Sequence, residues 1–279
     1  MALKLMYITN RPGVAQIAEK AGVDRIFVDM EYIGKAARQG GMDTVQNHHT
    51  IEDVRCIKNV VSKAQVMCRV NPIHSATADY CASEEEIEGA IDAGADILML
   101  PFFKTVEEVE KFITLVKGRV KTLLLVETPE AVNVIDQILE IPGVDEVFIG
   151  LNDLSLGYGM KFMFELLADG TVERLCKKFE AVGKPYGFGG IASLGHGLLP
   201  SEYIIREHYR LGSTCVILSR SFCNINNMNS LEEVDKVFVK GIRAIREFEG
   251  ECIQHMGDTQ YYSQNMKEVA QRVAMLEAD

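Results

Sequence analysis

Charged side chains follow several short apolar segments of this chain, at the points where the segments end. Asp29 and Glu31 close one such segment, and Arg69 ends the next. Glu127 and Asp153 follow two later segments. Carboxylate oxygens without His or Cys are a ligand set that suits Mg²⁺ and Mn²⁺. An arginine beside them can clamp an organic carboxylate and stabilise the charge of a developing enolate.

Glu127 and Asp153 are the candidate metal ligands. Two carboxylates would leave positions on the cation for waters and substrate oxygens. Each residue also has a structural interpretation. Glu127 would instead cap a helix that begins at Pro129, and Asp153 would form an Asx-turn. The spacing leaves both interpretations open.

Arg69 likewise has a functional and a structural interpretation. In the first, its guanidinium binds the substrate at the active site. In the second, it is an ion-pair partner of Asp29 or Glu31. Those two carboxylates otherwise serve as a general base or hold a metal-bound water.

Histidines and glycines supply weaker candidates. His48 and His49 lie in a loop before a predicted helix, where they either cap that helix in solvent or reach over the active site as a base or substrate contact. His196 is a second candidate of this kind. The glycines of segment 187–190 allow close approach of the backbone to a ligand, a weak signal for a phosphate or carboxylate cradle.

Motifs for several other reaction classes are absent from the sequence. No GxGxxG opens a helix, and neither GxxxxGK[ST] nor GxSxG occurs, so dinucleotide, ATP and serine-hydrolase chemistry lack their signatures. No lysine ends an apolar segment. Lys184 precedes one and Lys104 lies beyond another, which argues against a Schiff-base aldolase.

The apolar segments have the length and composition of strands buried on both faces. They are 3–8, 25–29, 65–70, 97–100, 122–126, 146–149, 186–188 and 214–218. Helical periodicity lies between them, with starts at Thr50, Ser83 (as a capping box with Glu86), Thr105, Pro129 and Ser230. This alternation, uninterrupted by any linker, favours a closed (β/α)₈ TIM barrel over a doubly wound open sheet. Chemistry in such a barrel belongs at the carboxyl ends of the strands, where the charged residues lie.

Composition limits the partners and the compartment. The 279 residues include 29 Lys and Arg against 40 Asp and Glu, a net charge of −11 that argues against nucleic-acid or membrane binding. The seven cysteines form no CxxC pair, and no targeting or membrane-spanning segment is evident, so we expect a cytoplasmic protein. We expect one barrel domain over 1–250 with an inserted loop at 34–49, and a helical extension over 251–279.

Five segments together resemble the HpcH/HpaI aldolase and citrate lyase β-chain family. They are 27–31, 68–71, 89–101, 125–131 and 143–155, and the likeness runs over most of residues 1–250. The last two segments are the most specific, because they carry a Glu and an Asp 26 positions apart. The resemblance implies a TIM barrel of the phosphoenolpyruvate/pyruvate type.

The resemblance also implies roles for the site residues. Glu127 and Asp153 would bind Mg²⁺, Mn²⁺ or another divalent cation, and a 2-oxo acid such as pyruvate would chelate that cation. Arg69 would contact the keto oxygen and stabilise the enolate. Backbone N–H groups around Asn152 and Asp153, next to Gly150, would receive the carboxylate. Such proteins usually form oligomers that exchange their final helix, so we expect a homo-oligomer, a trimer or hexamer, built with the segment after Ser230.

The sequence departs from the family pattern at three places. Tyr32 stands where related aldolases carry a His that works with an Asp as base, Leu125 stands where a Gln is common, and the loop 34–49 is longer than usual. We expect His49 or His48 to replace the missing base. The leading prediction is a divalent-metal-dependent carbon–carbon lyase acting through the enolate of pyruvate or another 2-oxo acid. The alternatives are a citrate-synthase-like or acyl-CoA lyase variant, and a non-catalytic barrel that binds 2-oxo acids.

Overall fold

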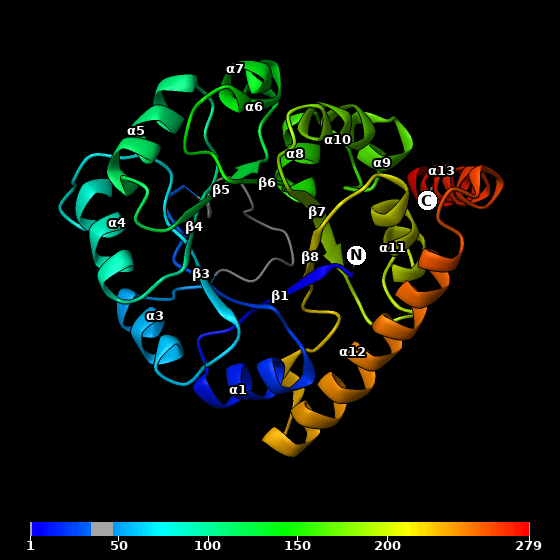
Figure 1. Cartoon of the computed structure of the whole chain (residues 1–279), viewed down its shortest axis with the longest axis horizontal. Coiled ribbons are helices and arrows are strands. Elements are labelled where there is room, and N and C mark those ends of the chain that lie inside the picture. The colour runs from blue at the N-terminus through cyan, green and yellow to red at the C-terminus, as the bar shows by residue number, and fades with distance from the viewer. Residues whose placement is uncertain (1, 35–46, 279) are drawn as a thin grey trace.

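Eight strands form one closed barrel in sequence order, each parallel to its neighbours, which confirms the predicted (β/α)₈ fold (Figure 1). The structure is a computed structural model, and it describes residues 2–34 and 47–278. Most of the predicted inserted loop 34–49 therefore lies outside the described residues. The strands are β1 Lys4–Ile8, β2 Arg25–Asp29, β3 Gln65–Arg69, β4 Ile97–Leu100, β5 Lys121–Val126, β6 Glu146–Ile149, β7 Tyr186–Ile191 and β8 Cys215–Leu218.

Helices surround the barrel as an outer layer, as Figure 1 shows. They are α1 Pro12–Ala21, α3 Ile51–Lys58, α4 Ser83–Asp92, α5 Val106–Val116, α6 Pro129–Asn133, α7 Ile135–Leu139, α8 Leu151–Gly157, α9 Glu165–Ala168, α10 Thr171–Ala181, α11 Ser201–Arg210, α12 Leu231–Gln254 and α13 Thr259–Ala278, with a 3₁₀ turn η1 at Ile225–Asn227. Within the described ranges no helix is both long and apolar enough to span a bilayer.

Side-chain caps start three helices as the sequence predicts. Thr50, Thr105 and Ser230 each accept a hydrogen bond from the backbone N–H three residues ahead, which satisfies one of the unpaired donors of a helix start. The side chain of Thr128 caps α6 in the same way, with Pro129 at its first position. Glu127 is therefore not needed as the cap of α6.

The predicted capping box at Ser83 is wrong. The cap position of α4 is Ala82, without a side-chain hydrogen bond, and Ser83 is the first helical residue. The Ser83 hydroxyl instead accepts from the N–H of His74, at 2.9 Å. The Glu86 carboxylate accepts from the backbone and side-chain amides of Asn71. The side chains of Ser83 and Glu86, which a capping box would use, thus bind the loop after β3 instead.

The core consists of an outer layer between barrel and helices and a smaller cluster inside the barrel. The inner cluster consists of Met6, Phe27, Met67, Ile97, Met99, Leu123, Leu125, Phe148 and Cys215. At the amino ends of the strands, Arg25 and Glu146 face one another inside the barrel. Two hydrogen bonds of 2.7 Å join them, and the Arg25 side chain is fully buried. The paired charges fill the end of the barrel that lies opposite the carboxyl ends of the strands.

The last two helices complete the outer layer. α12 packs along α1 and α11, and α13 packs against α9 and α11 of the same chain (Figure 1). The predicted boundary at residue 250 falls inside α12, which ends at Gln254. In the single chain, α13 thus packs on the outer helices α9 and α11 of its own barrel.

Candidate active site

Two neighbouring hollows lie at the carboxyl ends of the strands. The first, here called the small chamber, has a volume of about 190 Å³. Its floor is formed by Phe27, Met99, Leu125 and Phe148 of the inner cluster, and its polar lining includes Arg69, Glu127, Asn152 and Asp153. The structure therefore brings both candidate metal ligands and the predicted substrate-binding arginine to one small space.

Glu127 is a buried carboxylate with an unusual proton affinity. Its Oε1 accepts from the N–H of Phe102 at 2.9 Å, and its side chain is almost fully enclosed. Burial first, and then the negative charge of Glu31 and Asp153, raise the pKa of Glu127 to about 8 against the opposing effect of Arg69. The positive charge near this carboxylate does not balance the nearby negative charge. A bound cation would supply the missing positive charge and stabilise the ionised form.

Gly150 leaves room beside that carboxylate. A Cβ atom built at Gly150 would lie 2.8 Å from both Cβ and Oε2 of Glu127. The glycine follows β6 and is the cap position of α8, whose first turn contains Asp153, itself largely buried. Its missing side chain thus leaves space next to one oxygen of Glu127.

The oxygen ligands available in the small chamber fit a hard divalent cation. Glu127 and Asp153 offer oxygen ligands only, which is the chemistry of Mg²⁺ and Mn²⁺. Among the described residues, no group of three or more His, Cys, Asp and Glu side chains is arranged as a metal cage. A cation held by these two carboxylates would keep coordination positions for water or substrate oxygens.

Arg69 is held in place by both neighbouring carboxylates. Its Nε and Nη2 donate to the two oxygens of Asp29 at 2.7 and 2.8 Å, and its Nη1 lies 3.3 Å from Oε2 of Glu31. Its guanidinium also lies 5.5 Å from the centre of the Phe27 ring. The structural interpretation of Arg69 is therefore correct, and it is compatible with substrate binding, because Arg69 still lines the small chamber.

Asp29 is occupied by these contacts. Besides Arg69, its Oδ2 accepts from the Asn47 amide at 2.9 Å, and its Oδ1 accepts from the N–H of Glu31 at 3.3 Å. Both oxygens of the Asp29 carboxylate are therefore engaged by hydrogen-bond donors. The geometry gives Asp29 the role of orienting Arg69.

His49 lies at the predicted site, in an arrangement that suits a hydrogen-bond donor. Its Nδ1 accepts from the backbone N–H of Asp29 at 3.0 Å, so the proton of the neutral ring is on Nε2. In this tautomer the ring cannot receive a proton at Nε2. It can donate a hydrogen bond to an oxygen, as neutral imidazoles do in some enolising enzymes.

Three further side chains, Tyr32 at the position of the missing family base and the histidines His48 and His196, lie outside the small chamber. Tyr32 packs its ring 4.9 Å from that of Tyr80 and 5.8 Å from that of His48, and all three line another hollow. His48 and His196 are exposed and line neither the small chamber nor the hollow beside it. The site therefore does not gather these three side chains.

The glycines of segment 187–190 serve mainly the barrel wall. A Cβ at Gly187 would collide with the carbonyl oxygen of Cys215 on β8, and Gly189 has φ +53° with Leu151 against it. Gly189 and Gly190 do border the small chamber. Their lack of side chains permits close strand packing and keeps the chamber open.

The second hollow, here called the mouth chamber, adjoins the small chamber and has a volume of about 520 Å³. Both are lined by Arg69, Asn152 and Ile217. The mouth chamber also contains Arg11, after β1, and Arg220, after β8. The sequence placed both arginines at strand ends without indicating a role, because neither belongs to a recognisable motif.

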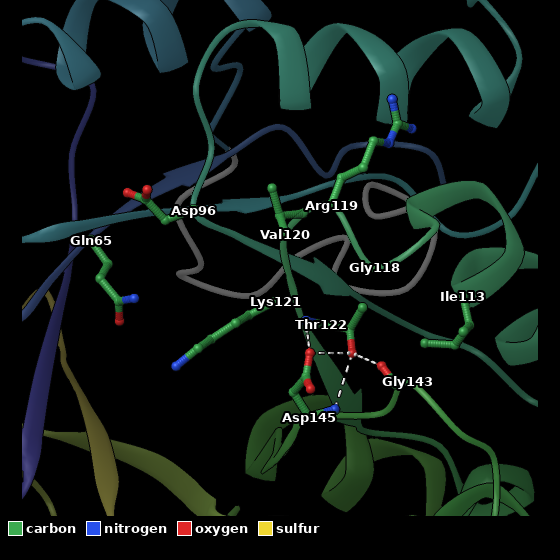
Figure 2. A pocket seen from close by; sticks show the side chains of 10 residues that line it. All are labelled: Gln65, Asp96, Ile113, Gly118, Arg119, Val120, Lys121, Thr122, Gly143 and Asp145. Carbon is green, nitrogen blue, oxygen red and sulfur yellow. Dashed lines mark hydrogen bonds between the residues drawn. The ribbon is translucent and has the colours of Figure 1, made fainter.

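A further hollow of about 460 Å³ lies at the opposite end of the barrel (Figure 2). Its polar groups are engaged in fixing loops: Thr122 donates to the carbonyl oxygen of Gly143, and its backbone N–H donates to Asp145 at 2.9 Å. Asp96 is bound by Lys58 and by the N–H of Val66. None of the predicted site residues lies there.

Fold and site together define a barrel with buried carboxylates after β5 and β6 and an arginine at the end of β3. The family model described as HpcH/HpaI aldolase/citrate lyase matches residues 4–165. The chain belongs to this family, as the sequence resemblance predicted. A comparison with curated proteins found no match.

Solved structures share the fold at low sequence identity. A HpcH/HpaI aldolase/citrate lyase family protein from Burkholderia cenocepacia J2315 superposes with a TM-score of 0.61 and 17% identity, covering 83% of this chain and 94% of its own. The HpcH/HpaI aldolase from Desulfitobacterium hafniense DCB-2 gives 0.59 and 17%, covering 88% and 93%. The citrate synthase SbnG gives 0.60 and 15%, covering 84% and 94%.

Proposed function

We propose that the protein is a divalent-metal-dependent carbon–carbon lyase that acts through the enolate of pyruvate or another 2-oxo acid. The observation that carries the proposal is the small chamber, where buried Glu127 and Asp153 lie beside Arg69. Membership of an aldolase and lyase family supports the reaction class. Seven free cysteines, five of them buried, support a reducing compartment such as the cytoplasm.

Glu127 and Asp153 would hold Mg²⁺ or Mn²⁺, which supplies Lewis-acid polarisation of the substrate carbonyl when bound. The protein's own groups do the remaining work. Arg69, fixed by Asp29 and Glu31, places its positive charge where the keto oxygen becomes negative. Backbone N–H groups at the start of α8 face the substrate carboxylate, and the apolar floor excludes water from the reacting carbon.

In the cleavage direction, the hydroxyl of the substrate passes its proton to solvent water, which later returns one to the enolate. The electron pair of the O–H bond forms the new carbonyl as the carbon–carbon bond breaks. One product is an aldehyde or ketone, and the other is the enolate of the 2-oxo acid, which then gains a proton at carbon. His49, as an Nε2–H donor at the mouth, would bind the oxygen that becomes the aldehyde carbonyl. The condensation direction reverses these steps.

One observation favours a citrate-synthase-like variant of this chemistry as the second candidate. Tyr32 replaces the family His and points into a separate hollow, so the proton acceptor of related aldolases has no counterpart at that position. A synthase would use the same enolate against a different acceptor carbonyl. A barrel of 15% identity that is named a citrate synthase shares this fold.

The decisive experiment follows the exchange of pyruvate methyl protons with D₂O by mass spectrometry, without any acceptor. We expect Mg²⁺- or Mn²⁺-dependent exchange that is lost in Glu127→Gln and is lowered at least 100-fold in Arg69→Ala. Glu110→Gln, an exposed glutamate on α5, is the matched control and retains exchange. Binding of 2-oxo acids without exchange, across a panel of them, would identify a non-catalytic binding protein instead.

A further inference from the structure

We propose that the hollow lined by Tyr32, Tyr80 and His48, here called the aromatic hollow, is a binding site for a small organic ammonium ion with methyl groups on its nitrogen. The hollow has a volume of about 410 Å³ and lies at the loops after β2 and β3. Among its described lining residues, it shares only His49 with the mouth chamber and none with the small chamber. The inference therefore concerns a separate site and does not depend on the lyase proposal.

Three aromatic rings line the aromatic hollow. The centre of the Tyr32 ring lies 4.9 Å from that of Tyr80 and 5.8 Å from that of His48, and the ring planes are inclined by 58° and 59°. Inclined rings leave part of each face uncovered, unlike stacked rings, and the face of an aromatic ring attracts a cation. Several such faces around one space are a means by which proteins recognise quaternary ammonium groups.

The Tyr32 ring occupies the position of the missing family base. It lines the aromatic hollow and not the small chamber. The backbone N–H groups of Tyr32 and Ile33 each donate to Oδ1 of Asn71 at 3.0 Å, and the Asn71 side-chain amide donates to Glu86 at 2.7 Å. Asn71 thus ties the loop after β2 to α4 and fixes the backbone that carries the Tyr32 ring.

Tyr80 is held by contacts within the loop after β3. The N–H of Thr77 donates to the carbonyl oxygen of Tyr80 at 2.9 Å, and the N–H of Tyr80 donates to the Thr77 hydroxyl at 3.2 Å. The two ring nitrogens of His74 lie 2.7 Å from the carbonyl oxygen of Pro72 and 2.8 Å from that of Cys81. Because these contacts close the loop on itself, a ligand would meet both tyrosines already positioned, which reduces the entropy lost on binding.

The acidic groups of the aromatic hollow favour a cation over an anion. Glu86 and Asp79 line the hollow, and its described lining includes no lysine or arginine. Burial first, and then the acidic groups of Tyr80 and Glu86, raise the pKa of the Tyr32 hydroxyl. The second of these causes reflects negative charge around the Tyr32 ring, and such surroundings attract a positively charged ligand.

A methylated ammonium ion fits these groups better than a primary amine or a metal ion. The Glu86 carboxylate already accepts from Asn71, at Oε1 from the side-chain amide (2.7 Å) and at Oε2 from the backbone N–H (3.2 Å). A primary ammonium brings three N–H donors that need acceptors, whereas a quaternary ammonium brings none. Within the part of the chain that the structure describes, no three His, Cys, Asp or Glu side chains are arranged to bind a metal ion.

The first experiment compares choline with its uncharged analogue, in which carbon replaces nitrogen, and with ethanolamine. Each is titrated by calorimetry into the full chain with Mg²⁺ at about pH 8, where free imidazole is uncharged. We expect choline to bind at least tenfold more tightly than either of the others. The methyl proton resonances of bound choline should also move upfield, because ring currents shield a group that lies over an aromatic face. Equal affinities for choline and the uncharged analogue, or for choline and ethanolamine, would overturn the proposal.

Leucine variants separate the effect of the ring faces from that of apolar contact. Tyr32→Leu and Tyr80→Leu should each weaken choline binding about 3- to 30-fold and affect the uncharged analogue little, while Tyr80→Phe retains choline binding. Tyr158→Leu changes an exposed tyrosine at the end of α8 and is the matched control, with unchanged binding. Urea denaturation verifies that each variant is folded. Equal losses in Tyr80→Phe and Tyr80→Leu would assign binding to the hydroxyl and overturn the role of the ring.

Two further measurements separate the aromatic hollow from the proposed active site. Glu127→Gln should bind choline as the wild type does, since Glu127 lines the small chamber and not the aromatic hollow. Saturating pyruvate should likewise leave choline bound. Loss of choline binding in either measurement would place the ligand in the active site and overturn the inference. Absence of pyruvate exchange in the wild type overturns the lyase proposal and does not affect this binding test.

Discussion

Gly150 shows how a residue without a side chain can determine the properties of a charged neighbour. It directly follows β6, and Glu127 fills the space beside it, because a Cβ built at Gly150 would lie 2.8 Å from Oε2 of Glu127. Its φ of −83° is accessible to any residue, so alanine is excluded by the carboxylate and not by backbone strain. The glycine therefore preserves one carboxylate position in the small chamber.

Gly150→Ala is expected to lower Mn²⁺ affinity at least tenfold, because the new methyl group displaces the Glu127 carboxylate. Titration followed by electron paramagnetic resonance of free Mn²⁺ measures the change. Gly250→Ala provides the control, since no heavy atom lies within 4 Å of a Cβ at that position. Unchanged affinity in Gly150→Ala would remove Glu127 from the ligand set.

The sequence indicated which residues gather at the site better than it indicated their interactions. Glu127, Asp153 and Arg69 lie together because they end neighbouring strands of a parallel barrel, and strand ends can be identified from apolar segments. The bidentate Arg69–Asp29 pair and the Nδ1 contact of His49 depend on side-chain directions that arise only on folding. Those directions make His49 a donor where the sequence suggested a base.

α12 shows how position along one helix reverses the effect of the same substitution. Gly241 faces the Phe222 ring, and a Cβ there would lie 2.6 Å from it. Gly250 has open space around it on the same helix. The two glycines differ in packing, while both cost helix propensity relative to alanine.

We expect Gly250→Ala to raise the free energy of unfolding by up to about 1 kcal/mol, the helix-propensity gain. Gly241→Ala should lower it by about 1–3 kcal/mol, because the added methyl group overpacks the contact with Phe222. Urea denaturation of both variants beside the wild type provides the measurement. Two changes of the same sign would contradict the described packing of α12.

Element boundaries were predicted well where local signals decide them. The bounds of β2, β4 and β6 are as predicted, because β-branched, aromatic and aliphatic residues fill all of β4 and the part of β2 and β6 between or after their charged end residues. β7 extends to Ile191, beyond the predicted end at Phe188. Glycines carry little strand preference, so the sequence did not indicate this extension, in which Gly190 and Ile191 pair with β8 after a register shift that includes Gly189. At α4, tertiary contacts replaced the local capping signal.

A buried histidine makes the stability of the whole molecule sensitive to acid. His208 on α11 is fully enclosed, stacks on Phe188 at 3.8 Å between ring centres, and shares a 2.8 Å hydrogen bond with Ser213. Burial lowers the pKa of His208 from 6.5 to about 3. Below pH 6.5 the unfolded chain therefore binds a proton that the folded chain excludes, and the free energy of unfolding falls until about pH 3.

His208→Asn should reduce this acid sensitivity. Between pH 7 and pH 5 the wild type is expected to lose about 2 kcal/mol more of its unfolding free energy than the variant. Urea denaturation at the two pH values measures the difference. His196→Asn, at an exposed loop position, serves as the control and should follow the wild type. Parallel pH profiles for His208→Asn and the wild type would exclude His208 as the cause.

The final helix is the element through which we propose that the chain assembles as a trimer or hexamer. In the single chain, the Asn265 amide donates to Glu207 at 2.8 Å and to the carbonyl oxygen of Tyr203, so α13 is bound specifically to α11. An exchanged helix makes the same contacts with a neighbour. Light scattering should give three or six times the chain mass, and ending the chain at His255 should give monomers. A monomeric full chain would contradict the proposal.

Closure of the barrel joins the first strand to the last, and this sets the order in which the chain can fold. Lys4 to Tyr7 of β1 pair with Cys215 to Leu218 of β8, and the N–H of Leu3 bonds to Glu249, 246 residues further along. During synthesis β1 therefore has an unpaired edge until nearly the whole chain has left the ribosome. Contacts this distant in sequence form slowly, because a long loop must close first. Aggregation during expression should therefore depend on how long that edge stays open, and slower synthesis or holding chaperones should change the yield of folded protein more than ligands do.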